Sequence, residues 1–373
     1  MVWKRKSFQN VIVVVIISLL LVALMHILHS KFKMSSKIQS QNESEFLSRN
    51  DAAINQSLPN VKRKQDYSCQ NIESIPFRHT GELHLMFIFH NAEPHGTLQR
   101  NFLRCVDSIF DKTSKPFAKI TCHIIGDLKS FQVAKDVFRE LRLYNLVKLE
   151  HHSNTALAEK ARLLLAPLLQ GLSVRRHHFS DPLFFISTVL HRLLPRNISR
   201  LILLDIDLVF KADVAGLLSL FDRFTGAQVV GIARENQPVY RHVFSEYRQR
   251  HQGTKIGEPP PNGITGVNSG VLLLDLDKLR CSEAYNSMFQ PGLVPGLVRN
   301  YSMSANLGDQ DFYTLVQLAR PELLYLLPCG WNRQLCQWWR MDHLQEVFDL
   351  FYACPEPISV FHGNCKANLS SVS

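Results

Sequence analysis

Short apolar runs and longer stretches with helical spacing alternate along most of this chain. Runs rich in Leu, Ile and Phe predict buried strands, whereas apolar residues recurring every three or four positions predict helices. Strands and helices alternate in this way from residue 83 onward, which is typical of a doubly wound sheet with mainly parallel strands. The predicted strands are 83–89, 120–125 and 146–149, followed by one that starts at Leu201, and the predicted helices are 98–110, 131–143, 156–170 and 182–194.

The order of the elements changes after residue 207. Further strands are predicted at 229–233 and 271–274, a polar helix at 241–252 and a last helix from Gly308 to Leu318. Residues 255–266 are rich in Pro and Gly and are expected to form a loop. We predict an α/β fold with a doubly wound, Rossmann-like mixed sheet, in a single folded domain over residues 79–373.

The N-terminal part of the chain has a different composition. Residues 8–28 are mostly Val, Ile and Leu, and about 20 such residues form a helix long enough to cross about 30 Å of hydrocarbon. A cleaved signal peptide is the alternative, but no small-residue cleavage site follows this stretch. We therefore predict a cytoplasmic tail over 1–7, a transmembrane signal-anchor over 8–28 and a polar lumenal stem over 29–78.

Cysteines and glycosylation sequons favour the same orientation. The chain has 8 Cys residues and no Cys-x-x-Cys pair, which favours disulfides in an oxidising compartment over a zinc site. Asn-x-Ser sequons begin at Asn42, Asn55, Asn197, Asn300 and Asn368. We expect a single-pass type II protein of the endoplasmic reticulum or Golgi membrane, with its folded domain in the lumen.

The excess of basic over acidic residues in the chain does not indicate nucleic-acid binding. The formal net charge is +10, but the basic residues are spread over the predicted stem and loops, and no base-reading motif is present. The sequence leaves the oligomeric state open, with a homodimer as one alternative.

A pair of carboxylates, Asp205 and Asp207, follows the most apolar predicted strand. Ligands of open α/β sheets bind outside the carboxyl ends of the strands, and two carboxylates there are typical of a divalent cation that also binds phosphate. The same spacing occurs twice more, at Asp275-Leu-Asp277 and Asp309-Gln-Asp311. A single copy is more often a solvated turn or a helix cap, and Asp277 is interpreted as an N-cap.

Four motifs in order along the chain resemble the retaining glycosyltransferases of family 8, which have a GT-A fold. The motifs are Leu-Leu-Asp205-Ile-Asp207, Asn268-Ser-Gly-Val-Leu-Leu-Leu, Leu307-Gly-Asp309-Gln310-Asp311 and His362-Gly-Asn-Cys-Lys366. The resemblance implies a catalytic domain in which Asp205, Asp207 and His362 hold Mn²⁺, with Mg²⁺ as the alternative. Two carboxylates, one imidazole and diphosphate oxygens suit Mn²⁺ better than a zinc cage.

The resemblance also implies roles for residues around this metal. Asp309 would bind sugar hydroxyls, and Gln310 would stabilise positive charge on the sugar during a front-face substitution that retains the anomeric configuration. The residues expected to contact the donor are Phe89, His90, Asn91, Ile206, Asn268 and Lys366, and those expected to contact the acceptor are Trp331 and Asn364. The chain departs from the family at Ser187, where most members have an arginine.

Within the family, the segment from Pro328 to Cys336 is most similar to enzymes with α-1,3-xylosyltransferase activity. The resemblance implies transfer of xylose from UDP-xylose to a terminal xylose of O-linked xylose-glucose on EGF repeats of Notch-type receptors. A glucoside xylosyltransferase, or a glucosyl- or galactosyltransferase of the same family, is the alternative. The rival classes are a lectin-like lumenal protein with an inactive site and a metal-dependent phosphohydrolase, but no second ligand cluster is evident in the sequence.

The four C-terminal cysteines are predicted to pair as Cys329–Cys354 and Cys336–Cys365. Four cysteines allow three pairings, and the sequence alone does not select one of them. The predicted pairing would tie the Trp-rich segment to the strand that carries His362.

Overall fold

The computed structural model of the protein describes residues 69, 82–114, 117–172, 181–304, 307–341 and 344–372. Apart from Cys69, the predicted tail, signal-anchor and stem (1–7, 8–28 and 29–78) lie outside these ranges, as does the expected start of the domain at residue 79. Across the part of the chain that is described, no helix is both long and apolar enough to cross a membrane.

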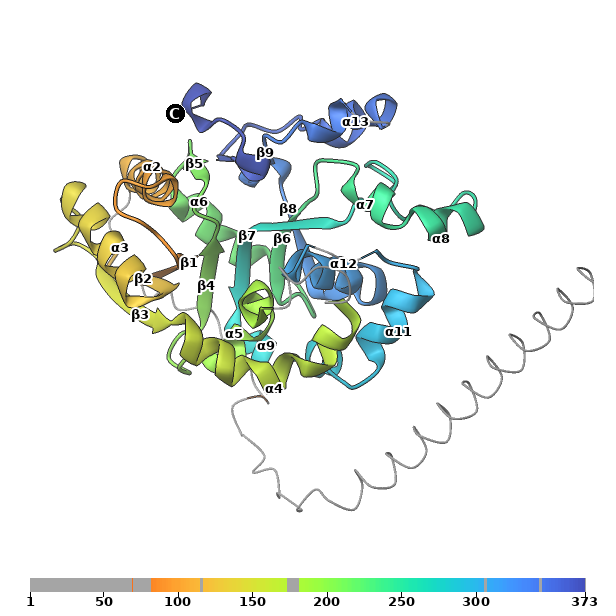
Figure 1. Cartoon of the computed structure of the whole chain (residues 1–373), viewed down its shortest axis with the longest axis horizontal. Helices are drawn as coiled ribbons and strands as arrows, with labels where there is room; N and C mark the ends of the chain where they lie inside the picture. The colour runs from red at the N-terminus through yellow and green to blue at the C-terminus, as the bar shows by residue number, and fades with distance from the viewer. Residues whose placement is uncertain are drawn as a thin grey trace, which may run out of the picture. The chain divides into compact units, whose positions relative to one another are not determined.

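A mixed β-sheet forms the centre of the folded part (Figure 1). Within the described ranges it has seven strands in the order β3-β2-β1-β4-β7-β6-β8. Strand β7 runs antiparallel to β4 and β6, and the other neighbouring strands are parallel. The strands are β1 (Glu82–Ile88), β2 (Lys119–Gly126), β3 (Lys148–Ser153), β4 (Arg200–Leu204), β6 (Val230–Arg234), β7 (Val267–Asp275) and β8 (Leu324–Leu327).

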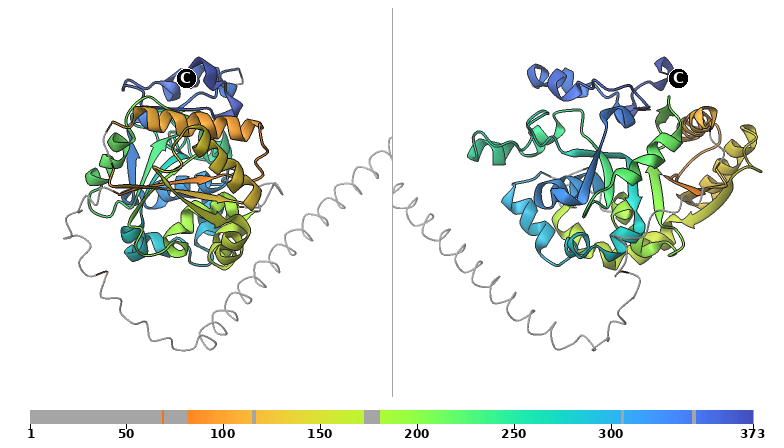
Figure 2. Two further views of the ribbon diagram at one scale, coloured as in Figure 1. Left: turned by 90° about the vertical axis from the view of Figure 1, so that its left-hand side faces the viewer. Right: turned by 180° about the vertical axis from the view of Figure 1, so that it is seen from behind.

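Helices cover both faces of this sheet, as two viewing directions show (Figures 1 and 2). The α-helices are α2 (Thr97–Lys112), α3 (Leu128–Glu140), α4 (Asn154–Leu172), α5 (Leu190–Leu193), α6 (Val214–Ser219), α7 (Val239–Val243), α8 (Ser245–Arg250), α9 (Leu276–Cys281), α10 (Glu283–Ser287), α11 (Leu293–Asn300), α12 (Asp309–Ala319) and α13 (Gln345–Tyr352). The 3-10 helices are η4 (Pro182–Val189), η5 (Leu220–Arg223), η6 (Pro321–Leu323), η7 (Cys329–Trp331), η8 (Trp338–Arg340), η9 (Asn364–Lys366) and η10 (Leu369–Ser371).

Strand β4 is apolar from Leu201 to Leu204 because both of its faces are buried there. Leu201 and Leu203 pack in one core cluster together with residues of α4 and η4. Ile202 and Leu204 point the other way and pack in a second cluster with residues of α2 and α3. A central strand with helices on both faces needs an apolar side chain at every position, as the sequence pattern predicted.

A second, smaller sheet lies at the end of β4 and brings the C-terminal segment to it. It consists of β5 (Leu208–Phe210), β10 (Val360–His362) and β9 (Arg333–Gln334). β5 follows β4 after three residues and pairs antiparallel with β10. In Figures 1 and 2 the C-terminal segment, drawn in dark blue, accordingly lies across one end of the main sheet.

The bounds of several predicted elements differ in the structure, including β7, which begins at Val267 rather than at residue 271. Strand β3 begins at Lys148 rather than at residue 146, because Leu146 lies in an exposed turn and pairing with β2 decides where the strand runs. The predicted helix at 182–194 is the 3-10 helix η4 followed by the short α5. The predicted helix at 241–252 is split into α7 and α8 at Phe244, whose backbone angles are not helical.

The interpretation of Asp277 as a helix cap is corrected by the structure. Asp275, the last residue of β7, caps α9 by accepting a hydrogen bond from the Lys278 backbone N–H at 3.0 Å. Asp277 instead lies in the first turn and pairs with Arg280 at 2.8 Å. The Asp-x-Asp pair does lie at the start of a helix, but its first member is the cap rather than its second.

Disulfide bonds join the four C-terminal cysteines as predicted, in the pairs Cys329–Cys354 and Cys336–Cys365. A further disulfide, which the sequence analysis did not predict, joins Cys69 to Cys281 at the end of α9. The other two cysteines, Cys105 and Cys122, are free and buried, where they serve as small apolar side chains.

Candidate active site

Three side chains able to bind a metal ion meet at the C-terminal end of β4. Asp205 follows β4 directly, and its backbone N–H donates to the Gly270 carbonyl at 2.9 Å. Asp207 precedes β5, and the β5–β10 pairing places Leu208 opposite His362. The His362 Nε2 atom lies 3.4 Å from Asp205 Oδ2 and 3.5 Å from Asp207 Oδ1. The structure thus brings together the three residues that the family resemblance implies as ligands.

The charges at this point fit a divalent cation. Burial lowers the pKa of His362, but hydrogen bonds and attraction from Asp205 and Asp207 outweigh it and raise the pKa to about 10. The two carboxylates therefore favour positive charge between themselves and the imidazole. A cation bound there would supply this positive charge. It would displace the proton from His362, because a ligating imidazole must be neutral. One nitrogen and several carboxylate oxygens suit Mn²⁺ or Mg²⁺.

A chain of hydrogen bonds holds the His362 ring with Nε2 facing the carboxylates. His362 Nδ1 lies 3.0 Å from Asn332 Oδ1. Asn332 Nδ2 donates to Asn268 Oδ1 at 2.9 Å, and Asn268 Nδ2 donates to the Glu235 carboxylate at 3.1 Å. Because a carboxylate only accepts, ionised Glu235 orients both amides so that His362 Nδ1 is the donor. The Nε2 lone pair is then free to bind a metal.

Gly270 leaves the space that this arrangement needs. A Cβ atom at this position would lie 2.3 Å from His362 Cε1 and 3.1 Å from Asp205 Oδ2. The first distance is far shorter than van der Waals contact, so a larger residue would displace either the imidazole or β7. The Asn-Ser-Gly motif at the start of β7 therefore allows the backbone to approach the site closely.

Gln310 belongs to the same hydrogen-bond network. Its Oε1 accepts from Asn268 Nδ2 at 3.1 Å, and its Nε2 donates to Glu235 Oε2 at 3.2 Å. Burial raises the pKa of Glu235 to about 7, although its hydrogen bonds with Asn268 and Gln310 act in the opposite direction. The Gln310 amide is thus held at both ends, and Glu235 and Asn268 decide where it points.

Asp309 opens α12 and accepts hydrogen bonds from two hydroxyl groups. Ser269 Oγ donates to Asp309 Oδ1 at 2.9 Å, and Ser187 Oγ donates to Asp309 Oδ2. Withdrawal from water raises the pKa of Asp309 to about 7, although both hydrogen bonds lower it. Arg192, the nearby basic residue, is directed at Asn286 instead. A hydroxyl rather than a positive charge therefore faces Asp309 at the position where the family has its arginine.

A cavity of about 530 Å³ opens beside these residues. Asp205, Asp207, His362, Gln310 and Glu235 contribute to its wall. The volume is in the range of pockets that bind small molecules. Beyond the hydrogen-bond network, the wall includes Gln237, Val239, His242, Val243, Trp338 and Trp339.

The expected donor contacts are only partly brought together by the fold. Asn268 lines the cavity, whereas Phe89, His90, Asn91, Ile206 and Lys366 are absent from its described wall. The Phe89 side chain is 1% exposed and stacks on Phe102, so it is a core residue and only its backbone could reach a ligand. His90 and Asn91 do follow β1, which lies beside β4, and so they end at the same edge of the sheet.

The expected acceptor contacts need one correction. Asn364 lines the cavity and accepts hydrogen bonds from the backbone N–H groups of Leu335 and Cys336. Trp331 does not line it, because its ring packs against Gly216 of α6. Trp338 and Trp339 line the cavity in its place, and Trp338 is 61% exposed. The aromatic surface at the site therefore comes from η8 rather than from η7.

The sequence analysis missed two members of the network. Glu235 directly follows β6, at the same edge of the sheet as Asp205, and a carboxylate after a predicted strand is a signal that could have indicated it. Asn332 is fully buried between η7 and β9. No local pattern marks Asn332, because its role depends on the C-terminal segment packing beside β7.

Comparison with known proteins agrees with the geometry of this site. The family described as Glycosyl transferase family 8 matches residues 6–337. The chain belongs to this family. It is 36% identical over 290 residues to xyloside xylosyltransferase 1 of Mus musculus, covering 76% of this chain and 74% of that protein. It is 35% identical over 296 residues to the Homo sapiens protein of that name, and this match covers 76% of this chain and 74% of that protein.

A solved structure of the same relative has a similar fold. The crystal structure of the mouse xyloside xylosyltransferase 1 in its apo form matches with a TM-score of 0.74 and 36% sequence identity. The match covers 77% of this chain and 99% of that chain. The predicted family resemblance and the mixed α/β fold of the GT-A type are thereby confirmed.

Proposed function

We propose that this protein transfers xylose from UDP-xylose, with retention of configuration, to the 3-hydroxyl of a terminal xylose. The acceptor would be the xylose-glucose disaccharide on EGF repeats of Notch-type receptors. The observation that carries the proposal is the similarity to xyloside xylosyltransferase 1 across 76% of the chain. The arrangement around the cavity supports it, since a metal-competent triad and the Gln310 amide line the same cavity.

Asp205, Asp207 and His362 would hold the cation, with Mn²⁺ preferred and Mg²⁺ as the alternative. When bound, the cation supplies Lewis-acid stabilisation of the departing diphosphate. Asn332 keeps the His362 ring in the orientation that leaves Nε2 free. The Asp205 side chain is 56% exposed, so a donor could approach it from the cavity.

Gln310 and Asp309 would act on the transferred sugar. Glu235 and Asn268 fix the Gln310 amide in advance, so its carbonyl dipole could stabilise positive charge on the sugar without reorganisation. An amide is a poor nucleophile, which favours a front-face substitution over a covalent intermediate. The acceptor hydroxyl then attacks from the side on which UDP departs, the UDP oxygen takes its proton, and the configuration is retained.

Other groups that line the cavity are suited to a sugar acceptor. Glu235 Oε1 and Gln237 Oε1 are buried oxygens without a hydrogen-bond partner among the described residues, and both side chains line the cavity. Hydroxyl groups of a sugar would supply donors for this unused capacity. Trp338 and Trp339 offer aromatic surface for a sugar ring or for the protein that carries it.

We also propose that the protein is a single-pass type II protein of the endoplasmic reticulum or Golgi membrane. The disulfide between Cys336 and Cys365 beside the cavity supports a lumenal location, because such bonds persist in oxidising compartments. In sealed microsomes, added protease should leave the folded domain intact. Digestion of the domain without detergent would contradict this orientation.

A donor screen with the purified protein tests the activity. UDP-xylose, UDP-glucose and UDP-galactose are compared with a xylose-glucose acceptor and Mn²⁺, and UDP release is measured together with transfer. Turnover is expected with UDP-xylose, and NMR of the product should show an α-linked xylose. Preference for another donor, transfer only to a bare glucose, or a β-anomeric proton would overturn the donor, the acceptor or the stereochemical claim respectively.

Two variants control this screen. Asp205→Asn should abolish turnover, whereas Asp277→Asn, in another Asp-x-Asp pair, should not. UDP release without transfer by the wild type would favour a hydrolase. Sugar binding without any turnover would favour a lectin-like protein.

A further inference from the structure

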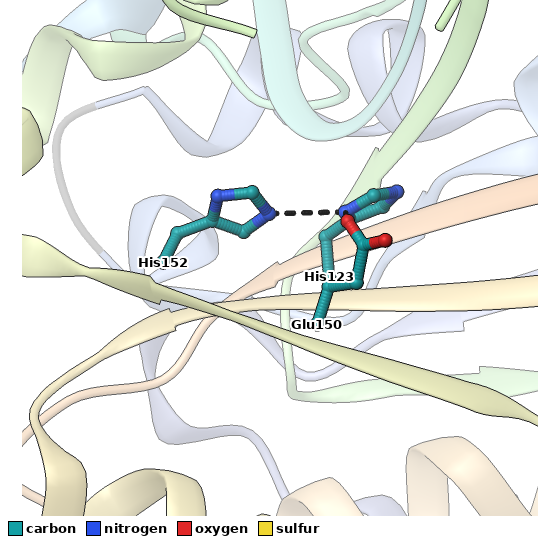
Figure 3. Close-up of side chains that lie close together, drawn as sticks. All are labelled: His123, Glu150 and His152. Carbon is teal, nitrogen blue, oxygen red and sulfur yellow. Dashed lines mark hydrogen bonds and ion pairs between the residues drawn. The ribbon is translucent and has the colours of Figure 1, made fainter. Parts of the chain in front are cut away.

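A second group of side chains that could bind a metal lies on a face of the main sheet and does not line the cavity. His123 is in β2, and Glu150 and His152 are in the edge strand β3. The strand register pairs His123 with Glu150, and His152 follows two residues later on the same face. Figure 3 shows the imidazoles of His123 and His152 directed at one another, with the Glu150 carboxylate beside the His123 ring.

The spacing of the three ligand atoms fits one small metal ion. His123 Nδ1 lies 3.0 Å from His152 Nε2 and 3.2 Å from Glu150 Oε2, and all three atoms lie within 4.8 Å of one another. A tetrahedral Zn²⁺ with bonds of about 2.0–2.1 Å separates its ligand atoms by about 3.3–3.4 Å. The two separations from His123 Nδ1 are within about 0.4 Å of this value, so the three groups are close enough to share one ion.

A second layer of side chains supports the first. His123 Nε2 lies 3.1 Å from His84 Nδ1 in β1, and His84 Nε2 lies 3.6 Å from Glu82 Oε2. If His123 binds through Nδ1, its Nε2–H donates to His84, and the Nε2–H of His84 can then point toward Glu82. A ligating histidine usually donates its other N–H to such a partner, which fixes the ring and its tautomer.

The cluster is partly open to solvent. The His123 side chain is fully buried, but Glu150 is 32% exposed, so an ion and a water molecule can reach the cluster from solvent.

We propose that His123, Glu150 and His152 form a Zn²⁺ site that fastens edge strand β3 to β2, with the fourth coordination position open to water. Two nitrogens and one carboxylate are a donor set that zinc commonly takes in tetrahedral sites. The Asp205, Asp207 and His362 group has the opposite balance, with two carboxylates and one nitrogen. This inference is independent of the proposed transferase function.

Metal titration of the purified full-length chain tests the site. The protein is stripped with a chelator and titrated with Co²⁺, whose strong visible absorption distinguishes tetrahedral from octahedral sites. Wild type is expected to show a tetrahedral spectrum that Zn²⁺ abolishes by displacement. In His152→Ala the spectrum should be lost, and the zinc affinity should fall on the order of 100-fold.

Three further variants separate this result from trivial causes. His151→Ala is the matched control, because His151 lies on the opposite face of β3 and contacts the Gly126 carbonyl and Phe131. It should retain the spectrum, as should Asp205→Asn. Glu150→Gln keeps the shape of the side chain and should weaken zinc binding even if His152→Ala fails to fold. Equal zinc affinity and an unchanged spectrum in wild type, Glu150→Gln and His152→Ala would overturn the proposal and leave a hydrogen-bonded histidine ladder.

Discussion

The group at the end of β4 and the group on β2 and β3 both combine histidine with carboxylate, but they occupy different kinds of place. Asp205 and Asp207 lie between β4 and β5, His362 is the last residue of β10, and the three side chains reach a cavity. His123 and Glu150 lie within paired strands, on a face of the sheet. Residues at or beyond the end of a strand can contact a ligand, whereas strand pairing fixes the positions of residues inside a ladder. Under the two proposals, the first group would bind a metal for chemistry and the second would bind a metal that holds structure.

The largest expected effect comes from removing a ligand of the first group. Asp205→Asn or His362→Ala should lower transferase activity on the order of 1,000-fold, or about 4 kcal/mol, because the diphosphate charge loses its counterion. The zinc affinity of the His123 group should not change. The measurement is kcat/KM with UDP-xylose beside a Co²⁺ titration. Full activity in both variants would show that the first group takes no part in the reaction, which would contradict the comparison.

The two C-terminal disulfides should differ in their effect on the first group. Cys336→Ser with Cys365→Ser is expected to cost about 3–4 kcal/mol of unfolding free energy, since a loop of about 30 residues loses its cross-link. Cys365 lines the cavity, so Mn²⁺ should also bind more weakly. The matched control is the double serine variant of Cys329 and Cys354, which do not line the described cavity. Denaturant unfolding and Mn²⁺ activation curves measure both effects, and equal loss of Mn²⁺ affinity in the two variants would contradict this.

Glu235, which lies beside the first group, and the His123 group should affect the pH dependence of stability in opposite directions. The pKa of Glu235 rises from its ordinary value of 4.5 to about 7 on folding. The unfolded chain therefore loses its proton first, and Glu235 destabilises the fold as pH rises from about 4.5 to about 7. The His123 group has depressed pKa values, so it destabilises the fold as pH falls below about 6.5.

Glu235→Gln tests the first half of that statement. In metal-free protein, the variant should remove a loss of stability of about 3 kcal/mol or less between pH 4.5 and 7, while the loss on acidification is unchanged. Chemical denaturation across this pH range measures it. Parallel pH profiles for wild type and variant would show that Glu235 titrates normally.

A smaller effect is expected from Asn332, which orients a ligand without binding metal itself. Asn332→Ala should weaken Mn²⁺ activation about 10–100-fold, because the His362 ring loses the acceptor that sets its tautomer. Asn332→Asp keeps that acceptor, so its Mn²⁺ activation should be weakened less. The readout is the Mn²⁺ concentration for half-maximal activity, and a change in kcat alone would argue against a positioning role.

The smallest effect is expected from the His123 group on catalysis. Strand β1 lies between β2 and β4, and the two groups share no hydrogen-bond partner among the described residues. His152→Ala should therefore change kcat/KM by less than about twofold, because separated sites act independently. His151→Ala provides the control. A large loss of activity in His152→Ala alone would mean that the two groups are coupled.

Several features of the protein were readable from the sequence because they depend on neighbours along the chain. A strand buried on both faces needs apolar residues at each position, so the run that starts at Leu201 predicted β4. The carboxylates that follow it marked the end of that strand. The resemblance of ordered motifs then added His362, far along the chain, and the family match confirmed the resemblance itself.

Only the tertiary structure decided which distant side chains meet. The apolar pattern predicted only the start of β3 and missed its polar end, which includes Glu150 and His152, and pairing with β2 is what creates the histidine cluster. Trp338 rather than Trp331 faces the cavity, because the C-terminal segment turns at η8 and packs Trp331 against α6. Apolar periodicity reports whether a position is buried, but convergence of polar groups depends on strand register and on contacts between segments far apart in sequence, which no local pattern specifies.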